Sequence, residues 1–147
     1  MDKKTQIKDI ERTEKEQEDR FDFEEKIIEF LQEQPERQTK IAEQLYWLSD
    51  SESKEKKKLE EKRNEIYKEV SEEVNEDGKK IFSNKELRDA ETDRRMNIRN
   101  DVVEIYQNLE SITEKKSKKQ REFEEIKVTG RNYRCILNYL GGVTDES

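Results

Sequence analysis

The sequence contains no histidine and only one cysteine, Cys135, among its 147 residues. Together these absences exclude a zinc cluster, a disulfide framework and a Cys–His catalytic pair within one chain. Cys135 lies among Tyr133, Ile136 and Leu137, so we expect its thiol to be buried as a small hydrophobic group. The lack of disulfide bonds fits a reducing compartment.

Hydrophobic residues make up only 29% of the chain, whereas charged residues make up 47%. A large spherical core needs more apolar residues, which leaves disordered chains and long helices joined along narrow seams. The single proline and four glycines argue against low-complexity disorder. No apolar run approaches a membrane span, and the N-terminus lacks the apolar core of a signal peptide. We therefore expect a soluble protein in the cytoplasm, that of the host cell if the protein is viral.

Apolar residues recur at alternating intervals of three and four, which predicts an all-α protein. The first helix is expected over about 5–33, and Pro35 predicts a break or kink after it. A second helix is expected over about 36–74 and a turn over 75–83, because Asp77-Gly78 favours a turn. Ser83 and Glu86 form a capping-box pattern that opens a third helix over about 84–140. The apolar phase passes through Gly130, and residues 141–147 form a loose tail.

Folding the second helix against the third gives a long antiparallel helical hairpin, a coiled coil, within a single domain over 1–147. The predicted register places Lys57 near Asp101 and Glu73 near Lys85, so that opposite charges meet. Two arrangements of the first helix remain open. It either continues the second helix after a kink at Pro35, or folds back to form a three-helix bundle at one end.

The densest apolar patch of the third helix faces residues 52–56 in this register, and those residues are all polar. A patch without an intrachain partner is predicted to be exposed and to form a homodimer seam or a docking surface. The alternative is a frayed crossing that a bent helix absorbs. The phenylalanines of the first helix are the second candidate surface. The predicted partner-binding residues are therefore Val102, Val103, Ile105, Tyr106, Phe21, Phe23 and Phe30.

One concentrated basic run follows in the third helix, and two further arginines lie among tyrosines near its end. Cations beside aromatic rings are typical of single-strand nucleic-acid binding. The acidic balance of the chain, with an isoelectric point near 5.0, favours instead a solvated stripe or one that faces the acidic first helix. The same applies to the lysine-rich run 54–58, which is predicted to be a solvated helix face. The candidate nucleic-acid residues are Lys115, Lys116, Lys118, Lys119, Arg121, Arg131 and Arg134.

Residues 77–91, followed by Arg94 and Arg95, resemble the turn of small coiled-coil proteins of phages and mobile elements. In those proteins a Gly-Lys-x-x-aromatic-Ser-Asn turn joins two helical arms, and a basic and apolar segment similar to residues 131–140 ends the second arm. The resemblance covers about residues 60–140 and leaves out the first helix and Pro35. It implies a phage or mobile-element origin and an accessory role in DNA metabolism or against host defences. It supplies no catalytic residues.

No glycine-rich phosphate loop, nucleophile elbow or metal-spaced cluster occurs in the sequence. We therefore expect no enzyme, no cofactor and no metal. The favoured function is a coiled-coil protein-interaction module, expected to be a homo-oligomer, that binds or occludes a protein partner such as a host defence factor. The alternative is an accessory factor for DNA recombination or replication that contacts single-stranded nucleic acid.

Overall fold

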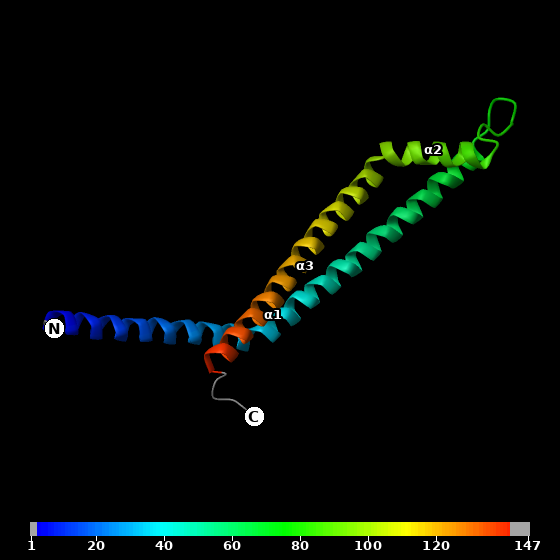
Figure 1. The fold of residues 1–147 in the computed structure, drawn as a ribbon. Coiled ribbons are helices and arrows are strands. Elements are labelled where there is room, and N and C mark those ends of the chain that lie inside the picture. The colour runs from blue at the N-terminus through cyan, green and yellow to red at the C-terminus, as the bar shows by residue number, and fades with distance from the viewer. Residues whose placement is uncertain (1–2, 142–147) are drawn as a thin grey trace. The chain divides into compact units, whose positions relative to one another are not determined.

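The computed structural model describes residues 3–141, and three helices account for most of them (Figure 1). Helix α1 spans Lys3–Glu72, α2 spans Lys85–Ile98 and α3 spans Asn100–Gly141. The predicted all-α class and helical hairpin are confirmed. Of the predicted tail, only Gly141 lies within the described residues, where it ends α3.

Pro35 does not interrupt α1, so the prediction of separate helices over 5–33 and 36–74 is wrong, as is the fold-back at Pro35. Proline inside a helix removes one backbone hydrogen bond, and its ring crowds the carbonyl four residues earlier. The loss is tolerated here because Ile27, Gln34 and Ile41 are all buried around the proline and hold this stretch of α1 in place. The Thr39 hydroxyl also donates a 2.8 Å hydrogen bond to the Pro35 carbonyl.

The predicted third helix is divided at Arg99 into α2 and α3, contrary to the prediction of one helix over 84–140. Arg99 has an extended backbone, with φ −78° and ψ 126°. Its N–H still donates to the Arg95 carbonyl, and its own carbonyl accepts from the N–H of Val103, so the break leaves both groups bonded. The carboxylate of Asp101 accepts from the N–H of Val102, which supports the start of α3. As predicted, α3 then continues through Gly130.

The turn between α1 and α2 is built around Gly78, whose φ of +76° confirms the predicted role of the Asp77-Gly78 pair. The side chain of Asn75 accepts hydrogen bonds from the N–H groups of Asp77 and Lys79 at 3.0 and 2.9 Å. The cap of α2 is Asn84 rather than the predicted Ser83, because Asn84 Oδ1 accepts from the Leu87 N–H at 2.8 Å.

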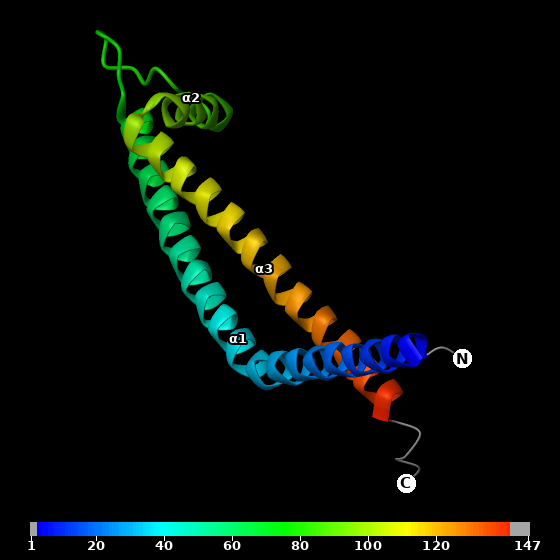
Figure 2. The same cartoon turned by 90° about the vertical axis from the view of Figure 1, so that its left-hand side faces the viewer.

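The chain forms two compact units, and each has its own core. Unit 1 consists of residues up to 42 and from 121 onward, and unit 2 consists of residues 43–120. In unit 1 the end of α3 packs against α1, and the buried residues include Ile27, Ile41 and Ile126. In unit 2 the second half of α1 lies antiparallel to the first half of α3, while α2 lies at one end (Figure 2). The unit 2 core comprises Ile66, Val70, Met96 and Val102, with Leu59 and Phe82 packed against it.

The register of the unit 2 hairpin differs from the predicted one. Asp101 pairs with Lys62 at 3.3 Å, five residues further along α1 than the predicted partner Lys57. Likewise, Glu73 forms an ion pair with Arg95 rather than with Lys85. Because the break at Arg99 and the long turn add non-helical residues, a register counted along one unbroken helix cannot hold.

Candidate interaction surfaces

The apolar patch of α3 has a partner within the chain, so its predicted role as an open docking surface is wrong for its central residues. Val102 is fully buried, with 0% of its surface exposed, in the cluster that contains Ile66 and Val70. Ile105 is buried as well. Val103 is half-buried and Tyr106 is exposed. The true register brings the patch to the apolar end of α1 instead of to the polar residues 52–56.

The three phenylalanines of α1 fall into two groups. Phe30 lies inside unit 1, where its ring meets that of Tyr133 edge-on with centroids 5.1 Å apart. The guanidinium of Arg37 lies over the Phe30 ring, 5.5 Å from its centroid. Phe21 and Phe23 are exposed, Phe21 to 66%. Only these two remain available to a partner.

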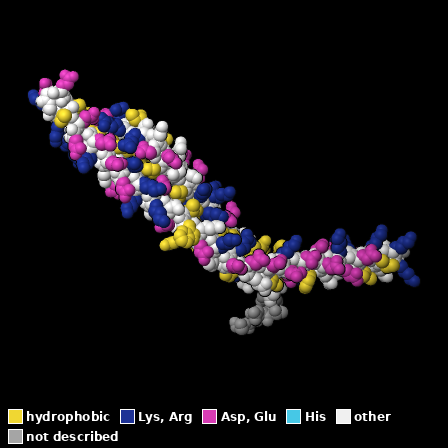
Figure 3. Space-filling model, turned by 180° about the vertical axis from the view of Figure 1, so that it is seen from behind, with side chains coloured by type: hydrophobic (Ala, Val, Ile, Leu, Met, Phe, Trp, Pro, Cys, Tyr) yellow, Lys and Arg dark blue, Asp and Glu magenta, His cyan; other side chains and the backbone are white. Residues whose placement is uncertain are grey.

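Residues 3–23 of α1, called the N-terminal segment below, are exposed at every position. The apolar side chains Ile7, Ile10, Phe21 and Phe23 are therefore left in water, with Ile7 and Ile10 exposed to 55% and 58%. Acidic and basic side chains both lie along this part of the surface, with hydrophobic ones between them (Figure 3). The internal support for the segment comes from ion pairs on the helix surface, such as Arg12–Glu16 and Arg20–Glu24.

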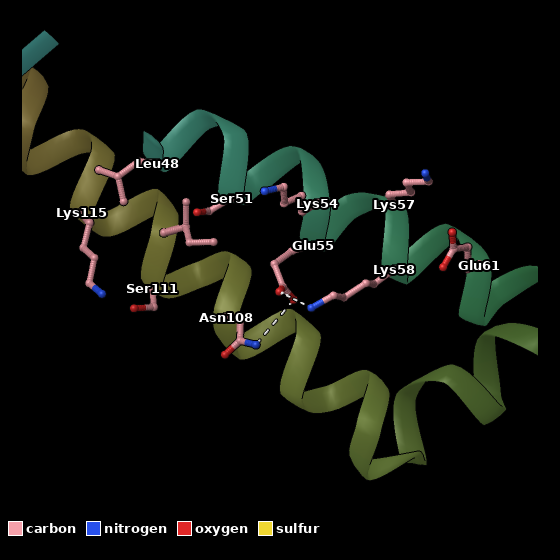
Figure 4. Close-up of a pocket in the computed structure, with 11 residues that line it drawn as sticks. Leu48, Ser51, Lys54, Glu55, Lys57, Lys58, Glu61, Asn108, Ser111 and Lys115 are labelled. Atoms are coloured by element: carbon pink, nitrogen blue, oxygen red, sulfur yellow. Dashed lines mark hydrogen bonds and ion pairs between the residues drawn. The ribbon is translucent and has the colours of Figure 1, made fainter. Parts of the chain in front are cut away.

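A groove of about 570 Å³ lies between α1 and α3 in unit 2, and four of its eleven lining residues are lysines (Figure 4). Its apolar lining comes from Leu48 and Ile112, both half-buried. Asn108 of α3 donates to Glu55 of α1 across the groove at 3.5 Å, and Lys58 bonds to Glu55 within α1 at 3.1 Å. We call this the lysine groove. Its charged lining residues are Lys54, Lys57, Lys58, Lys115, Glu55 and Glu61.

Sequence reasoning missed the lysine groove because it treated the run 54–58 as a solvated face. Lys57 and Lys58 follow Lys54 by three and four residues, which places all three on one side of α1. That spacing is a signal visible in the sequence. The second half of the groove depends on the register, which brings Lys115 of α3 to the same groove and could not be read from the sequence.

The predicted nucleic-acid residues all lie on α3 and are divided between the two units. Lys115, Lys116, Lys118 and Lys119 belong to unit 2, whereas Arg121, Arg131 and Arg134 belong to unit 1. Lys116 is half-buried and pairs with Glu52 at 3.4 Å. Hydrogen bonds from Lys56 and then from Lys116 lower the pKa of Glu52. Lys116 therefore already has a carboxylate partner on α1.

An exposed aromatic pair, Tyr46 and Trp47, lies on α1 near the lysine groove. The two rings meet edge-on with centroids 5.6 Å apart, and both side chains are about two-thirds exposed. Tyrosine and tryptophan are the side chains most often found at binding hot spots. Because Leu48 lines the lysine groove, the pair directly precedes that groove in the sequence.

A polar contact lies where α1 and α3 approach each other in unit 1. Gln34 is only 5% exposed, and its amide oxygen accepts from Arg134 at 3.3 Å. The amide stands directly over Gly130, where a Cβ atom would be 2.2 Å from Gln34 Oε1. Gly130 is thus the position at which α3 makes room for the glutamine. Cys135, which was expected to be buried in this unit, is exposed instead.

An ionic cluster joins α2 to the end of α1 in unit 2. Glu91 accepts hydrogen bonds from Arg94 at 2.6 Å and from Arg95 at 2.9 Å. These bonds, from Arg94 first, lower the pKa of Glu91 to about 2. Arg95 also pairs with Glu73 and lies over the ring of Phe82. The cluster fixes α2 across the turn. Both of its arginines already have carboxylate partners.

Comparison of the chain with protein-family models, with curated proteins and with solved structures finds no match to any of them. Within residues 3–141 no helix is both long enough and apolar enough to cross a membrane. In the same range no three or more Cys, Asp or Glu residues lie together as a potential metal site.

Proposed function

We propose that the chain is a non-enzymatic protein-interaction module that binds a partner protein through its N-terminal segment. The observation that supports this most is the complete exposure of residues 3–23 in a helix that carries Ile7, Ile10, Phe21 and Phe23. Isolated helices are only marginally stable in water, and most helices gain their stability by packing an apolar face. A partner that covers this face would supply the missing packing.

Burial of the apolar side chains at this face would supply part of the free energy that binding requires. Burial of a large apolar side chain contributes about 1.5–3 kcal/mol. Ile7, Ile10 and Phe21 share one side of the helix and are 55–66% exposed, whereas Phe23, two residues after Phe21, points to the other side. Covering the first three would therefore contribute on the order of 4 kcal/mol before the cost of association. The resemblance of residues 60–140 to phage and mobile-element proteins fits a role in which the module occludes a host protein.

A photo-cross-linking amino acid at Phe21 tests the proposal in cells of the native host. We expect adducts with a specific protein at this position. The matched control carries the same amino acid at Tyr139, an exposed aromatic position of unit 1 outside the segment. Adducts at Phe21 should disappear when Ile10 is replaced by serine. Equal labelling at Phe21 and Tyr139 would contradict the proposal.

A further inference from the structure

We infer that the partner of the N-terminal segment is a second copy of this chain, and that the two α1 helices pair side by side in the same direction as a parallel coiled coil. The inference rests on the proposed function, because it takes the segment to be a binding element, and it adds the occupant and its orientation. The contact face is a stripe along one side of α1, called the α1 seam below. It comprises Ile7, Ile10, Glu14, Gln17, Phe21, Glu24 and Ile28.

The α1 seam follows the repeat of a two-stranded coiled coil. Its residues recur at alternating intervals of three and four, which is the spacing of the a and d positions. Ile7, Phe21 and Ile28 stand at a positions, and Ile10 stands at a d position. These four side chains are 45–66% exposed. The seam therefore has apolar residues near both of its ends that nothing in the described chain covers.

In unit 1 the α1 seam lies on a side of α1 that α3 leaves free. The side that α3 covers carries Phe30, whose ring contacts Tyr133 of α3. Ile27, three residues before Phe30, is only 1% exposed. Ile28 is turned by about 100° from Ile27 around the helix axis and is 45% exposed. A second helix laid along the seam would therefore not displace α3.

The apolar residues of the α1 seam match only in a parallel pair. In the parallel alignment every seam residue faces its own counterpart, so all four apolar residues meet apolar ones. In an antiparallel pair, a positions face d positions instead. Ile10 is the one apolar d residue of the seam and faces a single a residue in any such alignment. The other two apolar a residues would then face Gln17 or Glu24, or lie beyond the seam.

The charges beside the α1 seam favour the same orientation. One flank, at the e positions, consists of Glu11, Glu18 and Glu25, and the other, at the g positions, includes Thr13 and Arg20. In a parallel coiled coil each g residue faces the next e residue of the second helix, so Arg20 faces Glu25 and Thr13 faces Glu18. An antiparallel pair would place the two glutamate flanks against each other, and like charges oppose such contact.

The polar residues of the α1 seam fix its register and moderate its affinity. Glu14 and Gln17 would each face their own counterpart between the apolar layers. A polar residue at a core position of a coiled coil lowers stability but specifies the alignment. The charge of the whole segment does not oppose pairing, because residues 3–23 contain seven acidic and six basic side chains, a net charge of −1. The expected complex is a reversible dimer.

Sedimentation velocity over a series of protein concentrations tests the inference with a matched pair of variants. We expect the wild type to approach twice its monomer mass of 17.8 kDa. Phe21→Ser should raise the dissociation constant at least about tenfold. Phe23→Ser removes an exposed phenylalanine on the other side of the helix and should leave the dissociation constant unchanged. A wild type that stays monomeric, or equal effects of the two substitutions, would overturn the inference.

A second pair of variants gives a result that a failure to fold cannot imitate. Glu14→Ile replaces two facing carboxylates by an apolar layer, so it should lower the dissociation constant at least about tenfold. Asp19→Ile removes the same charge and adds the same side chain on the opposite side of α1, where it should not tighten the dimer. Equal effects, or no tightening by Glu14→Ile, would count against the seam.

Oxidation of an introduced cysteine tests the orientation in a Cys135→Ser background. Lys3 stands seven residues before Ile10, so the cysteines of Lys3→Cys should face each other in a parallel dimer and form a disulfide. In an antiparallel pair that aligns residue 3 with residue 28, they would lie about 37 Å apart. Asp19→Cys, on the opposite side, is the control. Equal rates of disulfide formation would refute the parallel arrangement.

The seam variants and the cellular probe at Phe21 separate this inference from the proposed function. If the wild type is monomeric but the probe captures a different protein, the proposed function stands and this inference fails. If the probe captures a second copy of this chain and the seam variants behave as expected, both hold. If the probe labels no protein more than the Tyr139 control does, the proposed function fails.

Discussion

Replacement of Gly130 by alanine adds one methyl group at the point where Gln34 packs over α3. The new Cβ atom would stand 2.2 Å from Gln34 Oε1 and 2.5 Å from its Cδ atom, so the amide has to move. Gln34 is 5% exposed, and its displacement would break the hydrogen bond from Arg134. A hydrogen bond to a charged group contributes about 2 kcal/mol. Alanine in place of a helical glycine contributes about 1 kcal/mol in the opposite direction.

We therefore expect Gly130→Ala to lower the free energy of unfolding of unit 1 by about 1 kcal/mol. The sign should reverse when Gln34 is absent. In a Gln34→Ala background the methyl group meets no amide, and Gly130→Ala should stabilise the unit by about 1 kcal/mol. The coupling between the two positions would then be about 2 kcal/mol, which a double-mutant cycle measures.

Urea denaturation of the four proteins, followed by circular dichroism, gives the required free energies. Hydrogen exchange of peptides from residues 121–141 assigns the change to unit 1. Gly141→Ala is the control, because no atom lies within 4 Å of its added Cβ. If Gly130→Ala stabilises the protein with Gln34 present, the glutamine moves aside without cost and the argument from close packing is refuted.

Two further predictions concern unit 2. Asn84→Ala should destabilise the protein by about 1 kcal/mol, whereas Ser83→Ala should have little effect, because Asn84 rather than Ser83 caps α2; equal losses in urea denaturation would contradict this assignment. The hydrogen bonds that lower the pKa of Glu91 from 4.5 to about 2 stabilise the fold above pH 4.5, and this stabilisation is lost as the pH falls toward 2. Glu91→Gln should therefore flatten the decrease in thermal stability over this range, and Arg94→Gln should raise the pKa of Glu91 in an NMR titration; a Glu91 pKa near 4.5 in the wild type would refute the prediction.

The elements that follow from local chemistry were predictable from the sequence. The Gly78 turn depends on a residue that reaches positive φ, and the sequence offers a glycine after Asp77. The continuation of α3 through Gly130 follows from the apolar phase on both sides of it. The charged composition pointed correctly to helices with narrow cores. In each of these cases a short stretch of sequence carries the whole physical cause.

The break at Arg99 and the register of unit 2 could not be predicted in the same way. Neither proline nor glycine marks the break, and the apolar phase on its two sides gave no warning. Asp101, a residue type favoured at helix starts, is the one local signal that was present. The register between α1 and α3 depends on the number of non-helical residues before α3. Because the break at Arg99 was not predicted, Val102 was assigned the wrong partners on α1. That error made a core residue look like an open surface.

The role of Gln34 also lay outside what the sequence could indicate. A polar residue next to Pro35 gives no sign of burial, and glycine in a helix is ordinarily a weakness. Only the close approach of two helices shows that the small residue and the amide fit one another. The same distinction between local and tertiary features applies to the candidate surfaces. The exposed phenylalanines were visible in the sequence, whereas the groove needed two helices in register.

The single extended residue at Arg99 also limits how far a change in chain length can spread. In a continuous helix, one inserted residue rotates every later side chain by about 100° around the axis. The contacts of α3 with α1, such as Lys62 with Asp101 and Glu52 with Lys116, all lie beyond Arg99. An insertion in the turn before α2 is therefore separated from them by a non-helical joint. We therefore expect a variant with residues inserted between α1 and α2 to keep the same faces of the hairpin together.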